Sequence, residues 1–256
     1  MTRQVRAELA KVLTTRTWVV VLAVLVGYVL LNALALLFLD ELTRGQTGSE
    51  MVPGLESEQG VRNVWASAGG GYVLTLVFGV LVVTTEYRHR TISATLLAQP
   101  HRGRVVAAKL VATALVTTAF AAVATAAVAV VAVPVLAAKD AVALPGGHLA
   151  AILVGGVVGM VLYALLGVAV GALVRNQVAA LVGALVWVLL VEALLVAFLP
   201  SVGRWLPGGA VTSLVQASAF VEQEMLAPWL AAAVLLGYTV VLTVAAVATS
   251  QRRDVT

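Results

Sequence analysis

Six long apolar blocks, separated by short polar stretches, constrain the fold of this chain more than any other feature of its sequence. The blocks cover residues 17–39, 66–85, 110–138, 149–174, 178–199 and 228–249. A helix crosses about 30 Å of hydrocarbon with about 20 apolar residues, so each block is long enough to span a bilayer. Ala, Val and Leu fill the blocks without the alternation of barrel strands. The pattern predicts an all-α membrane protein with six transmembrane helices in a single transmembrane domain, residues 1–256.

The composition excludes several other classes of protein. Of the 256 residues 61% are hydrophobic and 11% are charged, whereas a soluble domain carries about 25% charged residues. No polar stretch is long enough to bury a soluble core of its own. The chain has no cysteine, so no disulfide or thiol nucleophile is available, and it lacks the HExxH pattern of zinc hydrolases. We expect no metal site, and no nucleic-acid partner because the cations gather at block ends.

The distribution of lysine and arginine predicts the orientation. If the N-terminus is cytoplasmic, the polar ends on that side hold most of the 16 basic residues, namely Arg3, Arg6, Lys11, Arg16, Arg88, Arg90, Arg102, Arg104, Lys109, Arg175, Arg252 and Arg253. Cytoplasmic loops of membrane proteins carry such an excess of positive charge. We therefore expect a multi-pass protein of the cytoplasmic membrane with both termini in the cytoplasm.

Residues 1–16 precede the first block and have the spacing of an amphipathic helix. Val5, Leu9, Val12 and Leu13 follow one another at helical intervals, with cations elsewhere on the helix. Such a helix lies in the membrane interface, with its apolar face down and its cations toward anionic headgroups. The alternative is a frayed cytoplasmic tail.

The outer connection 200–227 is too apolar for a simple solvated loop. Gly208 and Gly209 are expected to break it into two short pieces. Irregular backbone at membrane depth must be covered by protein, so we expect an apolar outer hairpin or loop that is partly re-entrant.

The connection between the second and third blocks, residues 86–104, has the most specific sequence. Residues 91–99 can form a short helix that Pro100 ends. Ile92, Leu96 and Leu97 give this helix an apolar stripe, and basic residues stand on both sides of it. A short helix of this kind suits docking into a groove on a soluble partner. The alternative is an ordinary cytoplasmic loop whose arginines only set the topology.

This segment resembles the coupling-helix region of type-2 ATP-binding-cassette transporter permeases. In that family an acidic residue ends the second span, and basic residues, a Thr-Ile helix start, a proline, a basic turn and a lysine follow. The matching positions here are Glu86, Arg88, Thr91, Ile92, Pro100, Arg102, Arg104 and Lys109. Many members have glycine where this chain has Arg90. The length, the six spans, the amphipathic N-terminal helix and the apolar outer loop are also similar to that family.

The resemblance implies a function for the chain as the membrane subunit of an exporter. Such permeases pair with a second permease, identical or related, and bind two separate P-loop ATPase subunits on the cytoplasmic side. The ATPases bind ATP and Mg and dock on the coupling helix, here the segment containing Arg90, Leu96 and Leu97 together with the matching positions above. The near absence of charge inside the spans favours an apolar or amphipathic substrate, which the sequence does not identify further.

The sequence itself requires a separate ATPase if ATP is used. A phosphate-binding loop needs a lysine followed by Ser or Thr after a glycine-rich run. Lys11, Lys109 and Lys139 are followed by Val, Leu and Asp. We therefore expect no cofactor in this chain and no enzymatic activity of its own.

Glu192 is the only carboxylate well inside an apolar block, and Asn32 lies at a similar depth. An acid within a membrane span marks a functional site by default, so both residues are candidates for the translocation path or its outer gate. The alternative is a protonated Glu192 bonded to a neighbouring helix or facing an outer vestibule. A second class of function is a stand-alone secondary transporter or channel that uses Glu192 for ion coupling or as a pore residue.

Overall fold

The computed structural model describes residues 2–43, 53–91, 101–216 and 225–252, and all regular structure in these ranges is helical. Within these ranges, six helical segments are long and apolar enough to cross a membrane. They are Thr17–Phe38, Glu58–Arg88, Gly103–Ala138, Gly146–Val174, Gln177–Phe198 and Pro228–Thr249. Each overlaps one of the six blocks that the sequence predicts. The chain is therefore a multi-pass helical membrane protein.

The helices follow one another along the chain without any intervening strand in the described ranges. In order they are α1 (Thr2–Thr14), α2 (Thr17–Thr43), α3 (Glu58–Ala66), the short η2 (Ser67–Gly69), α4 (Tyr72–Arg88), α6 (Arg102–Ala138), α7 (Gly146–Val174), α8 (Gln177–Val186), the π-helical η3 (Trp187–Glu192), α9 (Ala193–Phe198), α10 (Pro200–Gly203), α11 (Pro207–Val215) and α12 (Pro228–Arg252).

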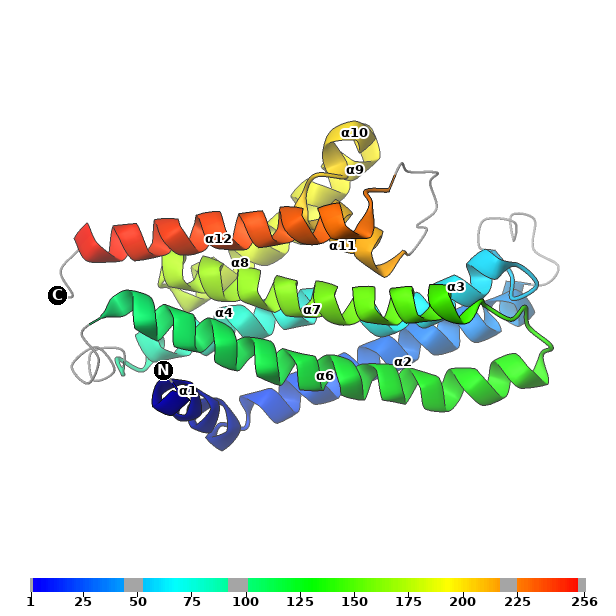
Figure 1. Ribbon diagram of the computed structural model, residues 1–256, viewed down its shortest axis with the longest axis horizontal. Coiled ribbons are helices and arrows are strands. Elements are labelled where there is room, and N and C mark those ends of the chain that lie inside the picture. Colours follow the sequence, from blue (N-terminus) through cyan, green and yellow to red (C-terminus); the bar gives the residue numbers. More distant parts are fainter. Residues whose placement is uncertain (1, 44–52, 92–100, 217–224, 253–256) are drawn as a thin grey trace.

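The long helices α2, α4, α6, α7 and α12 run side by side along the long axis of the molecule (Figure 1). α4 and α7 form the most extensive pair, and glycines let their backbones approach closely. A Cβ atom on Gly79 would collide with the carbonyl oxygen of Ala164, and one on Gly167 would collide with that of Leu76. Small residues serve this purpose in membrane bundles because lipid provides no hydrophobic drive for helix association.

The second and third spans differ in extent from the apolar blocks. The second continues back through η2 and α3 to Glu58, because Ser57 caps α3 by accepting a hydrogen bond from the Gly60 N–H. The third, α6, has 37 residues and is about 55 Å long at about 1.5 Å per residue. Pro134 lies inside α6 and does not end it. α6 is therefore much longer than the hydrocarbon layer requires.

The outer connection forms two short helices, α10 and α11. The break between them falls at residues 204–206, so the expected break at Gly208 and Gly209 was wrong. Both glycines belong to the first turn of α11, where Pro207 occupies the start of the helix. A proline fits there because the first helical N–H groups have no partner within the helix. Gly209 instead allows close packing, since a Cβ atom at this position would collide with the carbonyl oxygen of Gly203.

The first helix, α1, lies at the end of the bundle where α12 also ends (Figure 1). It packs mainly against α6, and Val12 and Leu9 join the apolar core formed by α2, α4 and α6. Leu13, in contrast, is 54% exposed. The position of α1 in a membrane interface stays a prediction.

Candidate functional site

Four charged side chains form a closed ring of ion pairs at the end of the bundle that holds α1. Lys11 Nζ lies 2.7 Å from Glu8 Oε1 and 2.9 Å from Glu86 Oε1. Lys109 Nζ lies 2.6 Å from Glu8 Oε2 and 2.8 Å from Glu86 Oε1. Glu8 and Lys11 come from α1, Glu86 from α4 and Lys109 from α6, so the ring joins three helices.

Local structure brings each member to the ring. Glu8 and Lys11 are three residues apart on α1 and therefore share one face of that helix. Glu86 lies in the last turn of α4, and Lys109 lies two turns into α6. These two ends flank the connection 89–101, so the ring stands directly beside the segment that the sequence singles out.

The ring is mostly shielded from solvent. The side chains of Lys109, Glu8 and Glu86 are 3%, 7% and 10% exposed, whereas that of Lys11 is 43% exposed. Two charges of each sign make the ring formally neutral, which is the condition under which buried charges are tolerated. Burial lowers the pKa of the Lys11 ammonium, but its hydrogen bonds to Glu8 and Glu86 outweigh this effect. The pKa of Lys11 therefore lies above its ordinary value.

One carboxylate oxygen of the ring, Oε2 of Glu86, makes no hydrogen bond within the described residues. Both lysines bond to Oε1 of Glu86, and Oε2 is buried without a hydrogen-bond partner in the described part of the chain. A buried polar atom without a partner is uncommon and destabilising in folded proteins. Oε2 of Glu86 therefore lies in the ring without a compensating hydrogen bond from the described residues.

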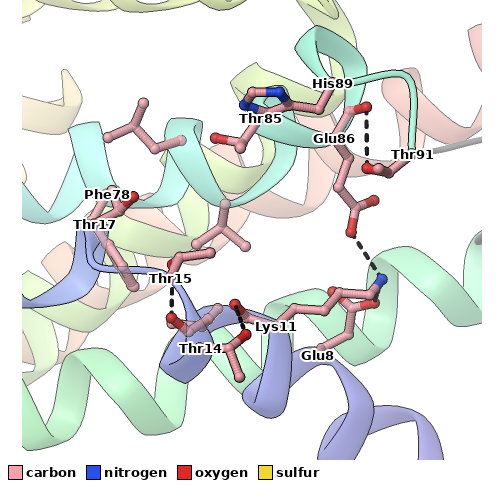
Figure 2. A pocket seen from close by; sticks show the side chains of 13 residues that line it. Glu8, Lys11, Thr14, Thr15, Thr17, Phe78, Thr85, Glu86, His89 and Thr91 are labelled. Atoms are coloured by element: carbon pink, nitrogen blue, oxygen red, sulfur yellow. Dashed lines mark hydrogen bonds and ion pairs between the residues drawn. The ribbon is translucent and has the colours of Figure 1, made fainter.

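A cavity of about 400 Å³ lies between α1 and α4 next to the ring. In Figure 2 Glu86 points from α4 toward Lys11 of α1, and threonines stand along the same opening. Phe78, Leu81 and Val82 of α4 form the apolar wall. The cavity thus combines a charged end with an apolar side.

Residues of the predicted coupling segment that are described fall into two groups. Glu86 and Lys109 belong to the ring, whereas Arg88, Arg90 and Arg104 are exposed. Arg88 Nη1 donates to Gln177 Oε1 at 3.3 Å, at the start of α8. Arg102 is the first residue of α6. Thr91 is described and exposed. Four further candidates, Ile92, Leu96, Leu97 and Pro100, lie outside the described residues.

The end of α4 holds Arg90 in a left-handed backbone conformation. The Thr91 N–H donates to the Glu86 carbonyl at 3.0 Å, and the Arg90 N–H donates to the Tyr87 carbonyl at 3.3 Å. These two bonds define a Schellman motif, in which the residue after the helix cap adopts a left-handed conformation. Arg90 has a φ of 55°, a conformation that glycine adopts without strain.

Glu192 lies in the fifth span and is 2% exposed. Its Oε1 accepts a hydrogen bond from the Trp187 indole at 2.6 Å, and its Oε2 accepts one from the Gly208 N–H at 2.6 Å. The first bond spans the π-helical turn η3, and the second places the carboxylate at the N-terminus of α11, where the helix dipole favours negative charge. Through these two hydrogen bonds Glu192 links α11 of the outer connection to the fifth span.

In the described ranges, no hydrogen bond connects the Asn32 side chain with Glu192. Its side-chain amide donates to the Tyr28 carbonyl at 2.9 Å, within α2 itself. The two residues thus make their hydrogen bonds in different parts of the molecule. A role of either in a translocation path stays a prediction.

Sequence reasoning missed Glu8 and assigned Lys11 only to the polar face of an interfacial helix. The available signal was a single carboxylate in an otherwise basic helix, three residues before a lysine. A lone acid on a surface that faces anionic lipid has no electrostatic reason to be there. Pairing with Lys109 across 101 residues supplies that reason, and only the folded chain shows it.

No model of a known protein family matches the chain, and no curated protein matches it in sequence. The class that the fold and site define is accordingly broad: a multi-pass helical membrane protein with a buried ion-pair ring at one end.

Proposed function

We propose that the chain is the membrane-spanning permease subunit of an ATP-binding-cassette exporter. In this proposal it moves an apolar or amphipathic substrate across the cytoplasmic membrane. Two separate P-loop ATPase subunits, which bind ATP and Mg, dock on the connection between the second and third spans. A second permease, identical or related, completes the transporter.

The ring of Glu8, Lys11, Glu86 and Lys109 is the observation that carries this proposal. It joins α1, α4 and α6 at the two ends of the connection on which an ATPase would dock. A displacement of that connection is therefore transmitted to three helices together, because separating them means parting buried charges. A cytoplasmic loop whose arginines only set the topology would not need buried ion pairs that join three helices.

The remaining support comes from what the chain contains. Its six apolar helices supply a membrane domain. None of its lysines stands in the pattern of a phosphate-binding loop, so ATP, if it drives transport, binds to another protein. The exposed arginines at the end of α4 and the start of α6 provide a positively charged rim around the connection.

The test is gentle purification of the tagged chain from its native membranes, followed by identification of bound proteins. We expect a stoichiometric P-loop ATPase, lost when Ile92 and Leu96 are both changed to Asp. The matched control is Val142→Asp, an exposed apolar residue in the connection between α6 and α7, which should leave the ATPase bound. A folded, stable preparation that repeatedly lacks an ATPase would overturn the proposal.

The second candidate is a stand-alone transporter or channel that depends on Glu192. The observation in its favour is a carboxylate buried in the fifth span. In that case Glu192→Gln abolishes ion-coupled transport in vesicles without any ATPase. If Glu192 instead only holds the hairpin, the same substitution lowers stability, because the amide NH₂ cannot accept the second hydrogen bond.

A further inference from the structure

Glu192 of the fifth span and Tyr163 of α7 meet beside the first turn of α11. A Cβ atom on Gly208 would collide with Glu192 Oε2, and the same point lies 3.7 Å from Tyr163 Oη. The carboxylate accepts the Gly208 N–H at 2.6 Å and so holds α11 at its N-terminus, where the helix dipole favours negative charge. Both side-chain oxygens therefore lie next to the residue through which α11 is held.

The Tyr163 hydroxyl makes no hydrogen bond within the described residues, although its side chain is 0% exposed. Buried hydroxyls in folded proteins nearly always have a partner, and a missing partner costs free energy. The ring packs edge-on against Tyr72 of α4, with centroids 4.9 Å apart. Because a hydroxyl can accept as well as donate, the structure holds an unused acceptor next to the Glu192 carboxyl group.

An added proton changes what the Glu192 carboxyl group can bond. As a carboxylate it offers two acceptor oxygens, which the Trp187 indole and the Gly208 N–H each use at 2.6 Å. A protonated carboxyl group has one carbonyl oxygen and one O–H donor. The two N–H donors then compete for one good acceptor, and the O–H needs an acceptor of its own. Tyr163 Oη has no other partner among the described residues and can take that role.

We propose that Glu192 is a proton-sensitive switch of the outer connection: as a carboxylate it holds α11, and on protonation it releases the Gly208 N–H and donates a hydrogen bond to Tyr163. Trp187 keeps its acceptor, because its bond spans the π-helical turn η3 to which Glu192 itself belongs. Such π-helical turns are frequent at functional sites. The released bond is one to a charged acceptor, which is roughly twice as strong as a bond between neutral groups.

The other titratable groups around this contact do not change charge in mild acid. Tyr72 of α4 and Tyr163 of α7 interact electrostatically with Glu192. Arg204 is the described cation of the outer connection, and Tyr238 is the titratable side chain described in α12. Tyrosine titrates near about pH 10 and arginine above about pH 12, so these four groups keep their charge from about pH 5 to about pH 8. A response of α11 in that interval therefore reports Glu192.

The experiment uses single thiols, because the chain has no cysteine of its own. Val211→Cys places a thiol on the buried face of α11, and Val202→Cys places one on α10 at a position that is 48% exposed. The full chain in phosphatidylcholine nanodiscs is labelled with a maleimide at about pH 8 and at about pH 5, and the rate at Val211→Cys is divided by that at Val202→Cys to cancel the pH dependence of the thiol. We expect this ratio to rise at least about tenfold in acid, because α11 loses a charge-assisted bond.

Two further substitutions assign the response. Tyr163→Phe removes a hydroxyl that has no partner in the described residues, so α11 should stay protected at both pH values. Glu192→Gln mimics the neutral acid, because its amide offers one acceptor oxygen and a donor group, and the ratio should be high and independent of pH. The matched control is Tyr238→Phe on α12, a tyrosine that is 37% exposed, which should keep the full acid response.

A ratio that is equal at the two pH values would overturn the proposal. An acid response that survives Tyr163→Phe would do the same, because the released state would then need no hydroxyl acceptor. A response that survives Glu192→Gln would show that another group titrates. If Glu192→Gln lowers the unfolding midpoint, Tyr163→Phe decides, since it removes no hydrogen bond of the described structure. The inference does not rest on the proposed function, because the labelling needs neither an ATPase nor a substrate.

Discussion

Replacing Lys109 by methionine is the sharpest test of the ion-pair ring. Methionine keeps most of the length and apolar contact of the lysine side chain but removes its charge. The change leaves Glu8, Glu86 and Lys11, so a formally neutral ring becomes one with a net negative charge. Both remaining carboxylates are about nine-tenths buried, at 7% and 10% exposed, so solvent can compensate them only in part.

The magnitude follows from the geometry of the lost pairs. Lys109 Nζ lies 2.6 and 2.8 Å from its two carboxylate oxygens, and at an effective dielectric constant of about 20 each pair attracts by about 6 kcal/mol. Most of this attraction offsets the desolvation of the charges. Lys109→Met leaves a buried carboxylate charge uncompensated. Removing one partner of a buried ion pair in this way costs about 3–5 kcal/mol. We expect a loss of about 4 kcal/mol in the free energy of unfolding.

The assay is reversible unfolding by sodium dodecyl sulfate in mixed micelles, followed by tryptophan fluorescence. Lys11→Met is the matched control, because Lys11 belongs to the same ring but its side chain is 43% exposed. Exposed ion pairs contribute about 1 kcal/mol or less, so this variant should lose much less stability. Adding Glu8→Gln to Lys109→Met restores neutrality and should cost less than the sum of the single changes by about 1–3 kcal/mol.

The reasoning is refuted if Lys109→Met costs no more than Lys11→Met. Strict additivity of Glu8→Gln and Lys109→Met would also contradict a shared ring, because groups that touch have measurable coupling. In either case the four charges act as separate surface residues, and the ring can no longer support transmission between the three helices.

Three other predictions concern stability. Gly79→Ala should lower the free energy of unfolding by about 2 kcal/mol because its Cβ meets the carbonyl of Ala164, whereas Gly183→Ala, with nothing within 4 Å, should be neutral or slightly stabilising. Arg90→Gly should raise stability by about 1 kcal/mol by relieving the left-handed backbone, and a lower denaturation midpoint would contradict this. The folded pKa of Lys11 is raised above 10.5, so its contribution to stability should be complete below about pH 10.5 and lost as pH rises through the folded pKa. Titration of wild type against Lys11→Met checks the last of these, and a difference that grows with pH would refute it.

Much of the fold was predictable because the bilayer sets the length and polarity of a span. Every apolar block overlaps a helical segment of the described residues that is long enough to cross a membrane. The ends of the spans were less predictable, since they depend on local hydrogen bonds. The start of the second span at Glu58 requires the cap at Ser57, and composition alone placed that stretch in a polar loop.

The sequence by itself determined which residues are chemically exceptional in a membrane chain. Glu192 stands out because charge inside an apolar block is costly, and that cost does not depend on the fold. Glu86 and Lys109 stand out as positions that resemble the coupling-helix pattern. What each residue contacts was decided only by the tertiary structure. Glu8 lies 101 positions from Lys109, and Glu192 meets the first turn of α11 through a hairpin. Such pairings depend on how helices pack across the bundle, and helical periodicity specifies the face of a residue without specifying the helix that it meets.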